Sequence, residues 1–355
     1  MKPNLKWLLC IILMFGCLVA FANVVRAKDI AIVALGGSGE VAFIDVENAR
    51  VLKSVPLKDR ASIPNRVAIT PDGETAIVTC IPGYLSFFDV KKMKCVKTLE
   101  LLTGPEDTGS SRPKRPNEFD DVAVTPDGTT ALVTEHNEEG EIFIVDVAAM
   151  KELPDKHLFV GDEPSTVIVK PDGMEAYVLD NGDVHILRLV AGAWTYDTTI
   201  PEPCGPEIED FDLTPDGSRA ILMDLDNRIY LVDTSAWNIL NMVVVEDRTT
   251  EPLQVAVSPV VDGDGNVMAI LTNATDQSIT VVTIGADNTM SYETPIDVFC
   301  SPDGVAFTPD GQTAVVACPN TSEVKIIDVA TETVTTISKG LGLAPVGVAI
   351  VDVPK

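Results

Sequence analysis

The sequence is poor in aromatic and basic residues. Phe, Trp and Tyr make up 5% of the 355 residues, and 26 Lys and Arg stand against 53 Asp and Glu, giving a formal net charge of −27. Proteins that bind nucleic acids stack bases on aromatic side chains and attract phosphates with basic ones. We therefore expect no nucleic-acid partner, whereas cationic partners, metal ions or simple solubility could each explain the negative charge.

Cofactor and nucleophile motifs are also lacking. The sequence has no Cys-x-x-Cys pair, and hence no covalent haem motif, no glycine-rich phosphate loop and no Gly-x-Ser-x-Gly elbow. Histidine is scarce, with only His136, His157 and His185. No cofactor is evident from the sequence, although a group bound without a covalent bond would leave no motif.

The sequence does contain a repeated corner. In VAITPDGETAIV, residues 67–78, a short apolar strand leads through Thr-Pro-Asp-Gly into a second apolar strand. Similar segments begin at Val122, Val167, Phe211 and Val305, and a longer copy begins at Val255. Pro presets the second turn position, Asp bonds its own backbone, and Gly accepts the positive φ that closes a tight hairpin.

A second marker gives the number of repeats. An alternating strand ends at residues 45, 89, 146, 188, 233, 283 and 328, with Asp in five copies and with Arg188 and Thr283 in the others. Seven copies spaced by 42 to 57 residues predict an all-β, seven-bladed β-propeller with four antiparallel strands per blade. The first repeat lacks an innermost strand, and the orphan strand GVAIVDV near the C-terminus supplies it. We therefore expect a ring closed by mixing N- and C-terminal strands.

The N-terminus has the pattern of a secretory signal. Lys2 and Lys6 precede an apolar run over residues 7–21, and small-residue cleavage patterns follow at residues 20–22 and 25–27. Residues 1–27 are thus predicted to be a signal peptide cleaved after residue 22 or 27. Residues 28–355 are predicted to be a single propeller domain without a membrane span.

The segments VAFTPDGQTAVVA, from Val305, and VKIIDVAT, from Val324, resemble the YVTN family of seven-bladed propeller repeats. The resemblance covers essentially the whole chain after the signal. It implies a propeller in a secreted or surface protein but no particular activity. Similar repeats occur in lactonase-like propellers, quinoprotein amine dehydrogenase subunits, the haem d1 domain of nitrite reductase and plain surface proteins.

In such a propeller, the loops that enter the innermost strands and the turns that leave the second strands share one face around the central channel. We call this face the channel mouth. A ligand-binding face is predicted there on an acidic arc: Asp120, Asp121, Glu135, Asp180, Asp210 and Asp224. Arg66, His136 and Glu209 are the candidates for catalysis of the lactonase-like type. The alternative is that these side chains cap turns or face water.

Two sets of oxygen ligands suggest a divalent cation, with calcium the best match. The first set is Asp121, Glu135 and Asp210. The second, Asp262, Asp264 and Asn266, alternates like the start of a calcium loop but lacks that loop's glycine and final acid. An elongated hairpin turn is therefore the alternative for the second set.

Export would permit disulfides. Cys300 precedes the innermost strand and Cys318 ends the second strand of the same repeat, so both are predicted at the channel mouth and as a disulfide pair. Cys80 and Cys95 are expected at opposite ends of their blade, too far apart to pair.

These observations predict an exported monomer of the periplasm or cell surface. It would act as a binding or protein-interaction scaffold that takes a protein or small-molecule ligand at the channel mouth. A basic loop within residues 102–118, with Arg112, Lys114 and Arg115, would adjoin the acidic arc. The alternative function is a metal-assisted or acid/base hydrolase of the lactonase-like type, so whether the protein is an enzyme stays open at the level of sequence.

Overall fold

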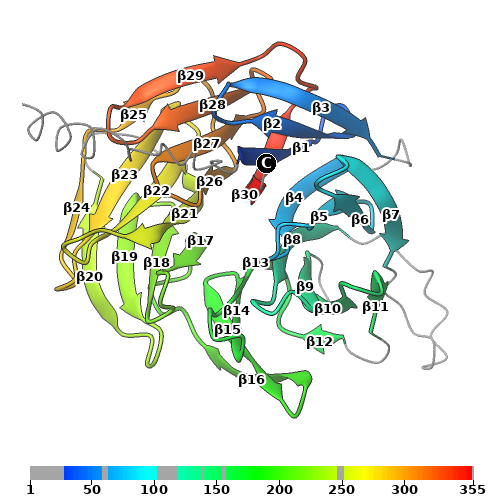
Figure 1. Cartoon of the computed structure of the whole chain (residues 1–355). Coiled ribbons are helices and arrows are strands. Elements are labelled where there is room, and N and C mark those ends of the chain that lie inside the picture. Colours follow the sequence, from blue (N-terminus) through cyan, green and yellow to red (C-terminus); the bar gives the residue numbers. More distant parts are fainter. Residues whose placement is uncertain are drawn as a thin grey trace, which may run out of the picture.

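The computed structural model describes residues 28–57, 63–101, 118–136, 140–153, 157–245 and 252–353. These residues form seven sheets arranged as a ring around a central opening (Figure 1). In this part of the chain, no helix is long and apolar enough to span a bilayer. The predicted signal peptide, residues 1–27, and the three basic residues of the loop before the third blade lie outside the described residues.

Each sheet is one blade, with its first strand nearest the channel and its last on the rim. Blade 1 consists of β30 (Pro345–Val353), β1 (Lys28–Leu35), β2 (Glu40–Asp45) and β3 (Arg50–Pro56), and blade 2 of β4 (Ile63–Ile69), β5 (Thr75–Ile81), β6 (Tyr84–Asp89) and β7 (Lys94–Glu100). Blade 3 consists of β8 (Phe119–Val124), β9 (Thr130–Glu135), β10 (Glu141–Asp146), β11 (Lys151–Glu152) and β12 (Leu158–Phe159). Blade 4 consists of β13 (Pro164–Val169), β14 (Glu175–Asp180), β15 (Asp183–Val190) and β16 (Ala193–Ile200). Blade 5 consists of β17 (Ile208–Leu213), β18 (Arg219–Asp224), β19 (Arg228–Asp233) and β20 (Ile239–Val244). Blade 6 consists of β21 (Pro252–Val261), β22 (Val267–Asn273), β23 (Ser278–Ile284), β24 (Met290–Tyr292) and β25 (Ile296–Asp297). Blade 7 consists of β26 (Val305–Phe307), β27 (Thr313–Cys318), β28 (Glu323–Asp328) and β29 (Thr333–Ile337).

The predicted fold and ring closure are confirmed. β30 pairs antiparallel with β1, from Lys28 opposite Val353 to Val33 opposite Val348, so the two ends of the described chain share blade 1. One detail differs from the prediction: the rim strand is split in blades 3 and 6, where β12 also pairs with β10 and β25 with β23. In blade 6, Pro295 lies between the two pieces, and proline has no N–H for a ladder bond.

The core lies between blades rather than within one layer. The second strands, such as β5 and β9, are buried on both faces because each sheet is sandwiched by its neighbours. This explains why these strands are apolar at nearly every position instead of alternating. Clusters such as the one joining Phe43 of blade 1 to Phe88 of blade 2 bind each blade to the next.

The repeated corner has the geometry that its residues predict. Asp72 Oδ1 accepts hydrogen bonds from Thr70 Oγ1 at 2.6 Å and from the Glu74 N–H at 3.0 Å, while Gly73 has a φ of 71°. The same Thr–Asp bond recurs in blades 3, 5 and 7. Because these turns connect the far ends of the innermost strands, they lie away from the channel mouth and serve the fold.

Candidate binding site at the channel mouth

The channel mouth is built from β-bulges. In six consecutive blades, the register of the innermost strand shifts near its start. The shifts lie between Pro345 and Val348, Pro64 and Val67, Phe119 and Val122, Pro164 and Val167, Ile208 and Asp210, and Pro252 and Val255. A bulge leaves residues unpaired and re-aims their side chains. Residues of the bulges in blades 2 to 6, with one from blade 7, line a hollow of about 240 Å³: Arg66, Asp120, Asp121, Ser165, Thr166, Glu209, Asp210, Leu253, Gln254 and Asp303.

Buried threonines of the second strands support three of the bulges. Thr79 Oγ1 accepts the Arg66 N–H at 2.9 Å, Thr134 Oγ1 accepts that of Asp121 at 2.8 Å, and Thr272 Oγ1 accepts that of Gln254 at 3.0 Å. All three threonines are completely buried. Each hydroxyl thus takes the place of the ladder partner that the bulged residue has lost.

The bulged side chains also join neighbouring blades. From blade 3 to blade 4, Asp121 Oδ2 accepts the Val167 N–H at 3.0 Å, and from blade 4 to blade 5, Thr166 Oγ1 donates to Asp210 Oδ1 at 2.7 Å. From blade 5 to blade 6, Asp210 Oδ2 accepts the Val255 N–H at 2.9 Å, and from blade 6 to blade 7, Gln254 Oε1 accepts the Val305 N–H at 2.8 Å. Blade 7 continues the series through backbone alone, from the Gly304 N–H to the Val346 carbonyl at 3.1 Å. The equivalent positions therefore form a belt of inter-blade hydrogen bonds around the channel.

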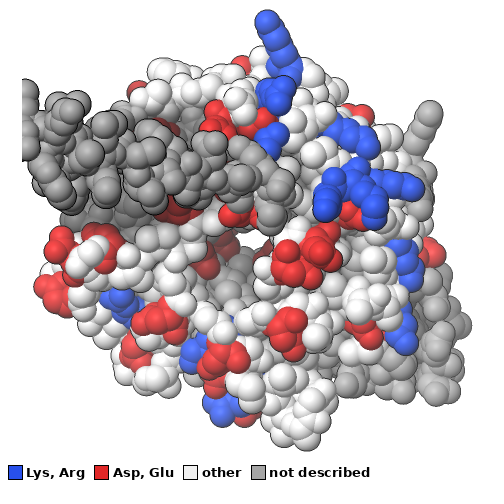
Figure 2. All heavy atoms as spheres, in the orientation of Figure 1, with Lys and Arg blue, Asp and Glu red and all other residues white. Residues whose placement is uncertain are grey.

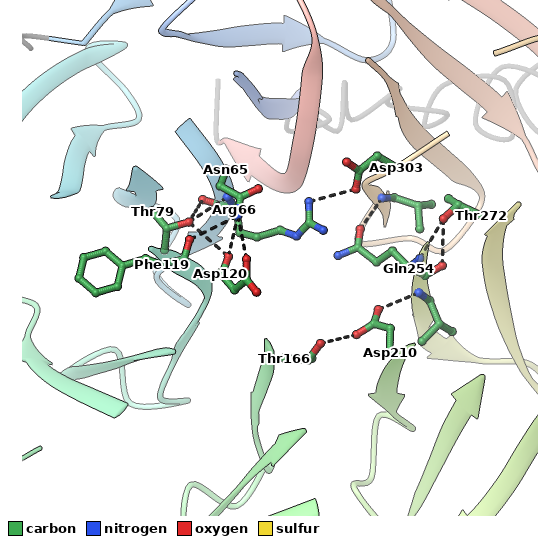
Figure 3. Close-up of polar contacts among 12 residues, drawn as sticks. Asn65, Arg66, Thr79, Phe119, Asp120, Thr166, Asp210, Gln254, Thr272 and Asp303 are labelled. Atoms are coloured by element: carbon green, nitrogen blue, oxygen red, sulfur yellow. Dashed lines mark hydrogen bonds and ion pairs between the residues drawn. The ribbon is translucent and has the colours of Figure 1, made fainter. Parts of the chain in front are cut away.

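Arg66 spans the part of this belt where side chains are missing. The equivalent residues in blades 7 and 1 are Gly304 and Gly347, and the guanidinium of Arg66 extends toward blade 7 to bond Asp303 at 3.1 Å (Figure 3). The Arg66 side chain is 24% exposed. Burial lowers its pKa, but Asp303, followed by Asp121, Asp210 and Asp120, raises it, and the net shift is upward.

Asp210 is buried and Asp121 is partly buried, and both carboxyls have raised pKa values. Burial raises the pKa of Asp121 to about 6 and that of Asp210 to about 7, against the opposing effect of the hydrogen bonds they accept. Both groups belong to the hollow at the mouth and to a larger cavity of about 480 Å³ in the channel below it. The channel cavity adds a third carboxyl, Asp212, whose pKa burial raises to about 6.

Asp120, His136 and Glu209 are the more accessible members of the predicted site. His136 Nδ1 lies 3.1 Å from Asp120 Oδ2, with side-chain exposures of 42% and 38%. Glu209 lines the hollow half-buried, and burial raises its pKa. Asp and Glu side chains gather around the central hollow in the space-filling view (Figure 2). Arg66 and Glu209 thus share the hollow, while His136 reaches it only through Asp120.

Three members of the predicted acidic arc lie elsewhere. Glu135, Asp180 and Asp224 end the second strands of their blades and are 0%, 7% and 2% exposed, and none of them lines the hollow or the channel cavity. Asp180 accepts the Glu163 N–H and contacts His185, and Asp224 accepts the Tyr230 hydroxyl at 2.9 Å. Asp180 and Asp224 thus bond within their own blades, on a strand one removed from the channel. The structure therefore does not bring the three acids together with Asp120, Asp121 and Asp210 at the hollow.

Neither predicted calcium set converges on a point. Among the described residues, no group of three or more His, Cys, Asp or Glu side chains is placed to hold a metal ion. Glu135 of the first set is buried away from the channel that Asp121 and Asp210 line. In the second set, Asp262 closes its own hairpin, accepting the N–H groups of Asp264 at 2.9 Å and Asn266 at 2.8 Å. The alternative of an elongated turn therefore describes this segment.

The structure contains the predicted Cys300–Cys318 disulfide, with Cα atoms 5.7 Å apart. It ties the loop entering the innermost strand of blade 7 to the end of the second strand, beside Asp303. Cys80 and Cys95 are buried free thiols, and burial raises the pKa of Cys80 to about 12.

Two acidic residues of the site had weak signals in the sequence. Asp303 stands in Pro302-Asp303-Gly304, which imitates the far-face corner although it lies at the mouth. Asp212 occupies a strand position that holds Ala or Ile in four other repeats: Ala68, Ala123, Ile168 and Ala306. A charge at an otherwise apolar position of a repeat is a signal that points to Asp212.

Comparison with known proteins supports the fold and gives no information on the activity. No family model matches the chain, and no curated protein matches its sequence. A functionally unknown protein from Desulfotomaculum acetoxidans has a similar structure, with a TM-score of 0.70, 17% identity and coverage of 91% of this chain and 99% of that one. A protein from Bacteroides fragilis proposed to be a 6-phosphogluconolactonase has a TM-score of 0.70 and 16% identity, and the match covers 93% of this chain and 99% of that one. A protein from Lactobacillus plantarum has a TM-score of 0.69 and 14% identity, and the match covers 92% of this chain and 100% of that one. At these identities, the likeness shows the fold alone.

Proposed function

We propose that this chain is an exported β-propeller of the periplasm or cell surface that binds a protein or small-molecule partner through its channel mouth. The observation that carries this proposal is the contrast between the two faces. The far-face corners repeat one turn from blade to blade, whereas the bulges at the mouth present a different side chain in almost every blade. Variation confined to one end of repeated strands is how propellers acquire separate binding surfaces on one scaffold.

The charge of the mouth favours a partner with a cationic or hydrogen-bond-donating surface. Asp120 and Glu209 are accessible there, and Arg66 is engaged by Asp303. The resemblance to YVTN repeats and the signal-like residues 1–27 support export. A partner would meet these acids at the edge of the hollow, where charges act mainly on encounter and specificity.

The test is capture of a partner from the envelope fraction of the source cells. Asp120→Lys with Glu209→Lys reverses charge at the mouth, and Asp197→Lys is the matched change on the rim strand β16. We expect the mouth variant to lose a partner that the parent and the rim variant retain. Equal capture by all three proteins would show that the mouth is not the binding face.

A second candidate function, an acid/base hydrolase of the lactonase-like type, is favoured by the Asp120–His136 pair beside Arg66. An imidazole held by a carboxylate at the rim of a hollow has the geometry of a general base. Assay of the parent and of Asp121→Ala, His136→Ala and Asp210→Ala against a lactone and ester panel tests it. Turnover that His136→Ala abolishes would support this function, and the absence of any turnover would reject it.

A further inference from the structure

The channel beneath the mouth is a second compartment with its own chemistry. Its cavity of about 480 Å³ has the size of a small-molecule site. It shares Asp121, Thr166, Asp210 and Gln254 with the hollow above, so these residues form a neck between the two. A small molecule that enters from the mouth passes this neck, and the cavity continues to Pro309 at a far-face corner.

The channel cavity is apolar on one side and acidic on the other. Blades 7 and 1 contribute an apolar wall: Val305, Ala306, Phe307, Val348, Ala349 and Ile350. Blades 3 and 5 contribute Asp121, Asp210 and Asp212. In a ring of seven, blades 7 and 1 lie across the axis from blades 3 to 5 (Figure 1). An occupant thus meets hydrocarbon on one side and carboxylates on the other.

The carboxyls of the channel share one cation, Arg66, with Asp303. Among the described residues that line the two cavities, Arg66 is the only Lys or Arg, and Asp303 engages it. The bonds that orient Asp121, Asp210 and Asp212 come from neutral groups, chiefly the N–H groups of Val167, Val255 and Val257. Burial raises the pKa of all three carboxyls and outweighs the opposing charge of Arg66 on Asp121 and Asp210, so a ligand cation would be stabilised there.

An organic cation fits this arrangement better than a metal ion. Calcium requires several oxygens to converge on one point, and the described residues contain no group of three or more His, Cys, Asp or Glu side chains placed to hold a metal ion. Each carboxyl already accepts an N–H of the adjacent blade. An ammonium group needs one or two acceptors, and its hydrocarbon body would cover the opposite wall.

We propose that the channel binds a small primary amine with an aliphatic body, with its ammonium against Asp210 and Asp212 and its hydrocarbon on β26 and β30. The proposal rests on the proposed function in that it uses the same opening, and it assigns the chemical class of a ligand. Asp210 and Asp212 are two positions apart on β17 and line the same cavity, as successive residues on one face of a strand do.

Calorimetric titration of the full chain at pH 8 tests the proposal with three probes of one length: n-hexylamine, n-hexanol and n-hexanoate. We expect the amine to bind at least about tenfold more tightly than the other two, since only the amine supplies the missing charge. Asp210→Asn and Asp212→Asn should each weaken amine binding by about tenfold or more, and Asp197→Asn on the rim should leave it unchanged. Binding should also weaken at pH 5.5, where Asp210, Asp212 and Asp121 take up protons while Arg66 stays charged.

The proposal is overturned if n-hexylamine does not bind, if n-hexanol binds as tightly, or if Asp197→Asn weakens binding as much as the channel variants. Asp210→Asn and Asp212→Asn are tested separately, so that a folding defect in one leaves the other to decide. Each must give the parent's circular dichroism spectrum. If the amine fails to bind while the mouth variant still loses its partner, only the channel proposal fails. If the amine binds and partner capture does not depend on the mouth, only the proposed function fails.

Discussion

The guanidinium of Arg66 and the carboxylate of Asp303 lie 3.1 Å apart although 237 residues separate them in the chain. Arg66 belongs to blade 2 and Asp303 to the loop entering blade 7, so the pair passes over blade 1, the blade that closes the ring. The ion pair therefore clamps the closing blade between its two neighbours.

Removing one partner of this pair should destabilise the ring. Arg66→Met leaves Asp303, Asp121 and Asp210 without their nearest cation, and we expect a loss of about 2 kcal/mol in the free energy of unfolding. Urea unfolding at pH 7 measures it. The double variant Arg66→Met with Asp303→Asn should lose less than the sum of the single variants, and strict additivity would show that the pair is not coupled.

Gly347 should tolerate no larger residue, because a Cβ there would overlap the Asn65 carbonyl and the Arg66 Cα. Gly347→Ala is expected to cost about 1 to 3 kcal/mol, as overpacking usually does. Gly263 is the matched control, since a Cβ there meets no atom within 4 Å. Similar unfolding midpoints for the two alanine variants would contradict the packing of blade 1 against blade 2.

The buried channel carboxyls should make the protein less stable as pH rises from about 4 to 7. Asp210 has a pKa of about 7 in the folded state against an ordinary value of 3.8, so the folded state binds more protons in this window and ionisation favours unfolding. Asp210→Asn should make the free energy of unfolding depend less on pH, so the variant and the parent should differ least in this free energy at low pH. Unfolding free energies at pH 4.5, 5.5, 6.5 and 7.5 provide the measurement, and parallel curves for the two proteins would count against it.

Deprotonation of His157 should cause a further loss of stability at higher pH, because its folded-state pKa is also raised. Hydrogen bonds from its ring to Glu141, at 3.0 Å, and to Glu152 raise its pKa to about 10 and tie the two halves of the blade 3 rim strand to β10. This stabilisation is full below pH 6.5 and is lost as pH rises through 10. His157→Gln is expected to cost about 1 to 3 kcal/mol at pH 7 and little above pH 10. An NMR titration in which the His157 ring changes charge near pH 6.5 would refute the prediction.

The Cys300–Cys318 bond should stabilise blade 7. The two residues are 18 apart in sequence, and a loop of that length corresponds to about 3 kcal/mol in the chain-entropy description. Replacing both with Ala should lower the unfolding midpoint, and a reducing agent should lower the parent's midpoint by a similar amount. The Ala variant should not respond to the reductant. A response there would point to a different source of the effect.

The repeats allowed the fold to be predicted closely, because the corners and the strands that end in Asp mark the same places in most of the blades. The site was predicted less completely. The sequence locates Arg66, Asp121 and Asp210 just before the innermost strands, but it does not reveal that bulges aim them into the channel. The sequence also does not distinguish Glu135, Asp180 and Asp224, which line neither cavity, from the acids that do, since an acid at a strand end looks the same whether or not it faces a channel.

The pairing of β30 with β1 has a consequence for how the protein is made. A chain emerging from the ribosome holds β1 from the start but cannot complete blade 1 until its last strand has been synthesised. A product that stops before Pro345 would keep six blades and an open seam, with the edge of β1 unpaired and ready to join another chain. The nine residues of β30 thus decide whether a nascent chain becomes a closed ring or a candidate for degradation.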